Sequence, residues 1–273
     1  MDSRQARILY HKNATAMAYV DVELRSGDRS IGSAFHIGDG VYVTARHVVE
    51  NNKIVEVKAT DPVSITAGEM FPSIPSGTIK EYESSLTEIM GHEPMFKHWP
   101  DALEIECGPF FPEDTRIDLA VFRASNVHPA AGVVDLGFHY DDWVYRYPWA
   151  LSDAVILGYP PIPLTSSPHL VSARAEIHTF VQPWHSPHVH FILSATPRGG
   201  FSGGVALHEG GVALGVITSG LRTDNLASDL GFMAVLSVEP IHVLLKDTEL
   251  TPTRQKENWK RMMQGCGRKR RSD

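Results

Sequence analysis

Ser202 stands in an unusual setting for a hydroxyl group that could act as a nucleophile. The segment TPRGGFSGGVAL, residues 196–207, places two glycines before Phe201 and Ser202 and two glycines directly after them. Glycine tolerates positive φ and lets neighbouring backbone approach closely, so the segment predicts a tight turn that presents the serine. A glycine-rich hairpin with an incidental serine would explain the same residues, and this segment alone does not decide between the two.

The residues after the serine argue against one common arrangement. The segment fits G-x-S-x-G, the turn that carries the nucleophile of α/β-hydrolases, but that turn needs a helix directly after the serine. Here two β-rich runs follow, residues 205–207 and 212–217, joined by a short loop that contains glycine. Such a pattern predicts a hairpin. We therefore expect Ser202 to precede a hairpin in a β domain.

A nucleophilic serine needs a base and a group that orients the base, because its hydroxyl is weakly nucleophilic at neutral pH. Among 14 histidines, His47 ends the run GVYVTARH, at a strand-to-turn junction where a side chain can face a cleft. Asp118 begins the apolar run DLAVFRA, where a carboxylate is costly unless it is paired or hydrogen-bonded. Taken singly, each residue also has an ordinary explanation: a half-buried histidine that closes a strand, and an exposed aspartate that caps one.

The three segments together are more specific than any one of them. Their order is His47, Asp118, Ser202, which is the order in chymotrypsin-type enzymes and differs from that in α/β-hydrolases and subtilisins. With GSAFHIGDGVYVTARHVV, DLAVFR and GGFSGG around these residues, the chain resembles the trypsin/chymotrypsin-like serine protease superfamily over residues 15–245. The resemblance is closest to the bacterial HtrA/Deg-like branch.

The resemblance implies a serine endopeptidase that acts on polypeptides. Ser202 would attack the peptide carbonyl, His47 would take and return the proton, and Asp118 would fix the imidazole. The backbone N–H groups of Gly200 and Ser202 would form the oxyanion hole. An inactive relative that only binds a peptide or partner stays open, and so does a serine esterase on the same fold. The intact set of three residues argues against the inactive relative, and ester turnover without peptide cleavage would mark the esterase.

Several positions depart from the family pattern. Phe201 stands where digestive members carry an aspartate that pairs with a new N-terminus, and no IVGG-like start is present, so zymogen cleavage of that type is not expected. Arg46 precedes the histidine where alanine is usual. About 30 residues follow the last expected strand, too few for the PDZ module of typical HtrA/Deg proteins.

The resemblance also places the pocket for the side chain before the scissile bond. The lining positions correspond to Thr196, Thr218, Ser219, Gly220 and Gly231. Thr196 brings no carboxylate to the pocket floor, so a buried Lys or Arg would lack a counter-charge. We expect preference for small or medium apolar side chains. Asp224 or Asp229, in the intervening loop, could overturn this by reaching into the pocket.

Short β-branched or aromatic runs bounded by Gly, Pro or Asp recur along the chain and favour a barrel or sandwich. With the resemblance, the expected fold is all-β, with two antiparallel six-stranded β-barrels and a C-terminal helix. Residues 1–125 are expected to form an N-terminal barrel carrying His47 and Asp118, and residues 126–150 the crossing between the barrels. Residues 151–237 are expected to form a C-terminal barrel carrying Ser202, and residues 238–273 the C-terminal helices and a basic tail. Residues 60–115 are expected to form an insertion with a short helix near EYESSLTEIM, which could cover the cleft.

Composition narrows the remaining classes. The 273 residues are 42% hydrophobic and 21% charged, as in ordinary soluble domains. A net charge of −7 argues against general nucleic-acid binding, and the tail GRKRRSD is expected to be a solvated end. No apolar run reaches about 18 residues and no signal peptide is visible, so a cytoplasmic protein without membrane contact is expected.

No cofactor, metal site or disulfide framework is expected. The only cysteines, Cys107 and Cys266, lie far apart in the sequence. His185, His188 and His190 lie close together, but no cysteine or acidic cluster accompanies them. The oligomeric state is not predicted.

Overall fold

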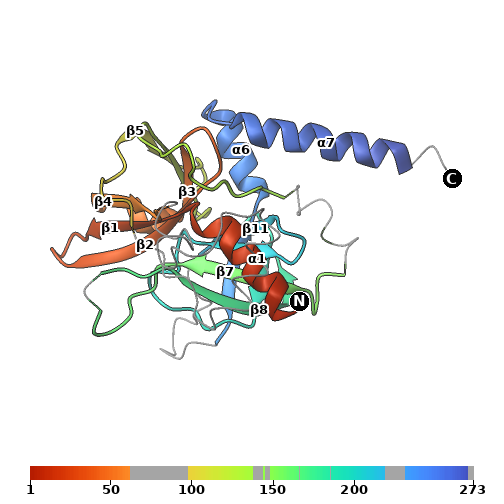
Figure 1. Ribbon diagram of the computed structural model, residues 1–273, viewed down its shortest axis with the longest axis horizontal. Coiled ribbons are helices and arrows are strands. Elements are labelled where there is room, and N and C mark those ends of the chain that lie inside the picture. Colours follow the sequence, from red (N-terminus) through yellow and green to blue (C-terminus); the bar gives the residue numbers. More distant parts are fainter. Residues whose placement is uncertain are drawn as a thin grey trace, which may run out of the picture.

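In the residues that the structure describes, twelve strands form two antiparallel six-stranded sheets, one from each half of the chain (Figure 1). The structure is a computed structural model that describes residues 1–61, 98–137, 144, 148–165, 167–184, 186–218 and 231–269, with side chains up to residue 261. Within these residues no helix is both long and apolar enough to cross a membrane.

The N-terminal sheet has the strand order β4-β1-β2-β3-β6-β5. Its strands are β1 (Met17–Glu23), β2 (Arg29–His36), β3 (Val41–Thr44), β4 (Lys53–Ala59), β5 (Ile105–Phe110) and β6 (Ala120–Ala124). Helix α1 (Ser3–Ala14) precedes the sheet, and its first turn is fixed by a capping box between Asp2 and Gln5. A one-turn helix, α2 (Arg46–Val49), follows β3.

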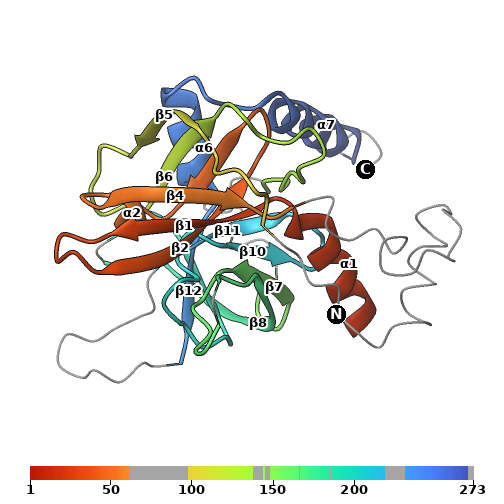
Figure 2. The same ribbon diagram turned by 60° about the vertical axis from the view of Figure 1, so that its left-hand side comes forward.

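The C-terminal sheet closes into a barrel with the order β10-β11-β12-β9-β8-β7. Pairing of β10 with β7, the first and last strands in this order, closes the barrel, so the sheet has no open edge. Its strands are β7 (Asp153–Gly158), β8 (Val171–Val181), β9 (His190–Leu193), β10 (Val205–His208), β11 (Ala213–Ile217) and β12 (Met233–Ser237). Helices α6 (Glu239–Asp247) and α7 (Thr253–Lys269) follow the barrel, and the C-terminal end of α7 points away from the N-terminal sheet (Figure 2).

The two sheets share a hydrophobic core. Val41 and Val43 of β3 face the same buried cluster as Ile156 and Phe191 of the barrel. The intervening residue, Tyr42, faces a second cluster on the other side of the N-terminal sheet. This alternation follows from the two-residue period of a strand. Because apolar side chains from both sheets meet in one cluster, the residues at the seam between the sheets are held in place from both sides.

These observations confirm the predicted all-β class with two antiparallel six-stranded sheets. Three details differ from the expectation. In the described residues the N-terminal sheet is a half-barrel and not a closed barrel. Helix α1 has no counterpart among the expected elements. Strand β5 lies within residues 60–115, where an insertion is expected, and it pairs with β6 as an edge of the sheet. The segment EYESSLTEIM lies outside the described residues, and the domain boundaries stay a prediction.

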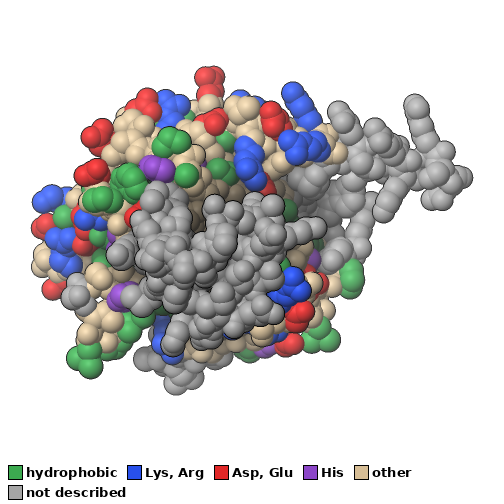
Figure 3. Space-filling model, in the orientation of Figure 1, with side chains coloured by type: hydrophobic (Ala, Val, Ile, Leu, Met, Phe, Trp, Pro, Cys, Tyr) green, Lys and Arg blue, Asp and Glu red, His purple; other side chains and the backbone are tan. Residues whose placement is uncertain are grey.

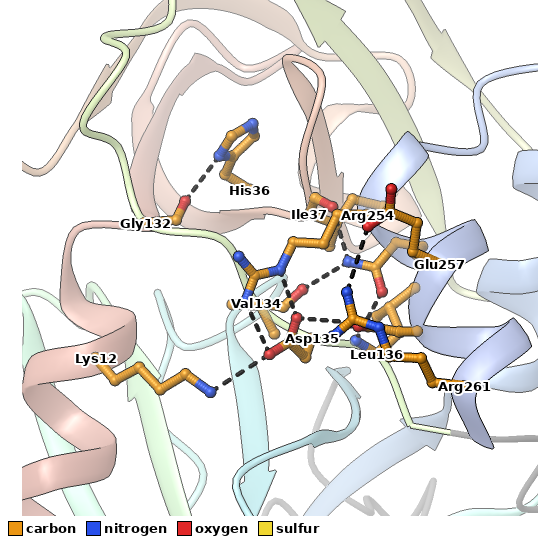
Figure 4. Close-up of polar contacts among 12 residues, drawn as sticks. Lys12, His36, Ile37, Gly132, Val134, Asp135, Leu136, Arg254, Glu257 and Arg261 are labelled. Carbon is orange, nitrogen blue, oxygen red and sulfur yellow. Dashed lines mark hydrogen bonds and ion pairs between the residues drawn. The ribbon is translucent and has the colours of Figure 1, made fainter. Parts of the chain in front are cut away.

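Helix α7 is fastened to the segment that crosses between the sheets by a group of polar side chains, here called the helix brace: Lys12, Asp135, Arg254, Gln255 and Asn258. Figure 4 shows Lys12 and Arg254 on either side of Asp135. Buried Gln255 donates from Nε2 to the carbonyls of Ile37 (2.8 Å) and Val134 (2.9 Å) and accepts the Leu136 amide at Oε1 (3.1 Å). The brace thus connects helix α7 with both the N-terminal sheet and the crossing segment.

Asp135 is the charged centre of the helix brace. Its carboxylate accepts hydrogen bonds from Arg254 (2.7 Å) and Asn258 (2.9 Å) and pairs with Lys12 of α1 (3.3 Å). Burial raises the pKa of this carboxyl, but the hydrogen bond and the charge of Arg254 lower it by more than burial raises it. The pKa of Asp135 therefore lies below its ordinary value.

Candidate active site

His47 and Asp118 are brought together by the pairing of β3 with β6. Thr44 is the register partner of Ala120 in this antiparallel pair. His47 lies three residues after Thr44 and Asp118 two residues before Ala120, so both extend from the same end of the two strands. Asp118 Oδ2 lies 2.7 Å from His47 Nδ1, and Asp118 Oδ1 accepts the backbone N–H of His47 at 3.0 Å.

This two-point contact fixes both the backbone and the ring of one histidine. An ionised carboxylate only accepts hydrogen bonds, so Nδ1 of His47 must carry the hydrogen. In the neutral imidazole, Nε2 is then the free base. The His47 side chain is 45% exposed and that of Asp118 is 26% exposed, which leaves the ring accessible to a substrate.

Ser202 lies on a turn that packs against the strands leading to His47. Gly203 has φ +83°, and a Cβ added there would lie 2.1 Å from the carbonyl oxygen of Ser33 and 2.3 Å from Thr44 Oγ1. Only a residue without a Cβ allows this approach. The backbone just after Ser202 therefore touches β2 and the end of β3, three residues before His47.

The amide groups of the turn follow an alternating pattern. Phe201 N–H donates to Arg198 O (3.3 Å), and Gly203 N–H donates to Ile217 O (2.8 Å). The amides of Gly200 and Ser202, which alternate with them, donate to no acceptor among the described residues. Gly200 has φ +89°, a conformation that glycine adopts without penalty. Two unused N–H donors two residues apart are the arrangement that an oxyanion hole requires.

The two unusual neighbours of the site each have a packing role. Phe201 is buried, and a Cβ at Gly158 of β7 would lie 2.8 Å from its ring. The phenyl ring therefore packs closely against β7 beside Ser202. Arg46 is also buried, with Nη2 donating to Pro112 O (2.6 Å) and the guanidinium 5.0 Å over the ring of Phe111.

The predicted specificity pocket is described only in part. Thr196 is exposed, and Thr218 is buried with its amide bonded to Ala234 O at 3.1 Å. Gly231 is exposed, with φ +72°. Ser219 and Gly220 lie outside the described residues, and so do the competing carboxylates Asp224 and Asp229. The pocket therefore stays a prediction.

Other candidate sites from the sequence gain no support. Within the described part of the chain, no group of three His, Cys, Asp or Glu side chains is placed to hold a metal ion. His185 is outside that part, and His190 Nδ1 lies 3.1 Å from the carbonyl of His188.

Over the N-terminal sheet, at the left of Figure 3, acidic and basic side chains are interspersed. The last four residues of the basic tail are not described.

Comparison with known proteins identifies the fold. No family model matches the sequence, and no curated protein is significantly similar to it. Among solved structures, the chain is similar to the Rv3671c protease of M. tuberculosis in its active form, with 15% identity, a TM-score of 0.57, and coverage of 90% of this chain and 86% of that one. The inactive form gives 14% identity and a TM-score of 0.55, with 90% and 95% covered.

The HtrA-type protease AlgW, solved with a tripeptide, gives 12% identity and a TM-score of 0.56. The match covers 91% of this chain and 64% of AlgW, so the chain spans less than two thirds of that protein. The fold is therefore that of the trypsin-like serine proteases, with HtrA-type proteases among the structural neighbours. At these identities the likeness concerns the fold.

Proposed function

We propose that the protein is a serine endopeptidase with His47, Asp118 and Ser202 as its catalytic residues. The observation that carries the proposal is the hydrogen-bonded pair of His47 and Asp118 at the end of β3 and β6, beside a turn with two unused amides. Each of these two features has a defined task in acyl transfer. The fold shared with known proteases supports the same conclusion.

The reaction would follow from these positions. Ser202 Oγ attacks the carbonyl carbon of the scissile peptide while its proton passes to Nε2 of His47. The carbonyl oxygen becomes an oxyanion that accepts hydrogen bonds from the backbone N–H groups of Gly200 and Ser202. When the C–N bond breaks, the amine leaves with the proton from His47, and an acyl-enzyme forms on Ser202. A water molecule then repeats the sequence and releases the acid.

Asp118 would serve this cycle by holding the imidazole. Its oxygens contact Nδ1 and the backbone amide of His47, so the ring cannot present the wrong tautomer without losing a short hydrogen bond. The carboxylate also stabilises the imidazolium that exists between the two proton transfers. The substrate is proposed to be a polypeptide cut after a small or medium apolar side chain, because Thr196 supplies no carboxylate for a basic one.

The decisive test is labelling by a fluorophosphonate, followed by intact-mass measurement of the wild type and Ser202→Ala. We expect one adduct on the wild type and none on the variant. A folded wild type without an adduct would contradict the proposal and favour an inactive binding protein. Cleavage profiling of a peptide library then distinguishes an endopeptidase from an esterase and tests the pocket. Ester turnover without peptide cleavage would indicate an esterase, and dominant cutting after Lys or Arg would indicate a carboxylate in the pocket.

A further inference from the structure

Ser33 of β2 is a completely buried hydroxyl residue in the N-terminal sheet, and its polar atoms reach into the turn that carries Ser202. Its Oγ donates to the carbonyl of Gly200 at 2.6 Å and accepts the amide of Tyr159 at 2.8 Å. Its backbone N–H donates to the carbonyl of Ser202 at 2.8 Å. Its own carbonyl accepts the Thr44 hydroxyl at 2.7 Å. Every hydrogen-bonding group of Ser33 is therefore engaged.

The two carbonyls that Ser33 holds belong to particular peptide planes. The carbonyl of Gly200 shares its plane with the amide of Phe201, which donates to Arg198 O at 3.3 Å. The carbonyl of Ser202 shares its plane with the amide of Gly203, which donates to Ile217 O at 2.8 Å. Both planes are thus fixed at both ends, and a peptide plane fixed at both ends cannot rotate.

The unused amides of Gly200 and Ser202 lie in the planes that alternate with these two. When every second plane of a tight turn is fixed, the orientation of the intervening planes is restricted as well. We propose that Ser33 is a positioning residue that orients the oxyanion-hole amides of Gly200 and Ser202 through the Gly200 carbonyl. This inference rests on the proposed protease function. It adds a role for the N-terminal sheet in a part of the site formed by the C-terminal barrel.

The test compares Ser33→Ala with a matched control, Thr60→Val. Thr60 is also a buried hydroxyl residue between the two sheets, and the partners of its Oγ1 are Met17 O (2.9 Å) and the Tyr159 hydroxyl, neither of which belongs to the turn of Ser202. Both substitutions remove one buried hydroxyl. Thermal unfolding and circular dichroism of both variants establish that they fold.

For Ser33→Ala we expect fluorophosphonate labelling and peptide kcat to fall by about 10- to 100-fold, less than or comparable to the loss of a direct oxyanion donor. KM should stay within about twofold because the substrate pocket is untouched. Thr60→Val should keep the wild-type kcat. Equal losses in both variants, or full activity in Ser33→Ala, would overturn the inference. If Ser33→Ala does not fold, Ser33→Cys keeps a weaker donor at the same position, and a smaller loss in the same direction is expected.

Amide hydrogen exchange at Phe201 and Gly203 gives a readout that does not depend on activity. The inference predicts faster exchange at the Phe201 amide in Ser33→Ala and unchanged exchange there in Thr60→Val. The Gly203 amide is the internal control, because its peptide plane is held by the backbone N–H of residue 33, which the alanine variant keeps. If the wild type is not labelled at Ser202, the proposed function fails, and this exchange measurement still decides whether Ser33 holds the turn. Unchanged exchange in Ser33→Ala would overturn the positioning role even in an active protease.

Discussion

Two groups of polar contacts in this molecule use different chemistry: one joins the two sheets, and the other fastens helix α7. The first, here called the Ser33 seam, consists of neutral, buried hydrogen bonds: Ser33 donates to the carbonyls of Gly200 and Ser202 and accepts the amide of Tyr159. The helix brace centres on Asp135 and Arg254, which are charged, and the Arg254 side chain is 48% exposed. Buried neutral bonds fix a geometry independently of the solution, whereas partly exposed charge pairs respond to salt and pH.

The two groups of contacts meet different structural requirements. A catalytic turn must hold its amides within a fraction of an ångström, and in the proposed enzyme the Ser33 seam supplies this precision. The brace only has to keep helix α7 on the crossing segment, a task that tolerates small movements. The following predictions compare equivalent changes in the two groups of contacts or in their immediate neighbours.

The largest contrast is expected from the same substitution at two aspartates. Asp118→Asn should lower kcat for peptide cleavage by about 10,000-fold, because an amide no longer enforces the His47 tautomer, while the melting temperature changes little. Asp135→Asn should do the reverse, with lower stability and wild-type kcat. Steady-state kinetics and thermal unfolding of both proteins measure the two effects. Comparable kcat losses in the two variants would refute the assignment of Asp118 to catalysis.

A smaller effect, on stability, is expected from Gly203→Ala. The added methyl would lie 2.1 Å from Ser33 O at a φ of +83°, so strain and contact together should cost about 2–4 kcal/mol of unfolding free energy. Gly199→Ala is the control, since nothing lies within 4 Å of a Cβ there. Urea unfolding of both variants gives the comparison. A stable, fully active Gly203→Ala would show that the turn is not packed against β2 as described.

The smallest effect is expected from Arg254→Gln in the helix brace. It should cost about 0.5–1 kcal/mol at low salt, and the cost should shrink in about 0.5 M salt. Burial raises the pKa of Asp135, but Arg254 brings it below its ordinary value of 3.8, so the contribution of Arg254 is present above that pH and is lost as the pH falls through the lowered pKa. Arg261→Gln, whose partner Glu257 is exposed and lies outside the brace, is the control. A cost that is unchanged at about pH 2 or in high salt would contradict the ionic character of the brace.

The sequence predicts the general fold because its strand runs and turns are local signals. Strands β1 to β4 and β6 to β12 coincide with alternating or β-branched runs, and the hairpin of β10 and β11 is visible from its glycine-containing loop. Strand β5 escapes prediction because its sequence, IECGPF, contains glycine and proline, which are poor strand formers. It is a strand because β6 offers it an edge to pair with. Helix α1 escapes prediction because its apolar residues are few and form only a weak helical pattern.

The order of His47, Asp118 and Ser202 along the chain, with their flanking residues, is enough to propose a catalytic set. Their types and spacing are properties of the sequence. That His47 and Asp118 meet at 2.7 Å is decided by the tertiary structure, because it depends on the register of β3 and β6. Ser33 gives no signal at all, since a serine in a strand is an ordinary residue. Its contact with Gly200 joins residues 167 positions apart, and only the packing of two separately formed sheets brings such residues together.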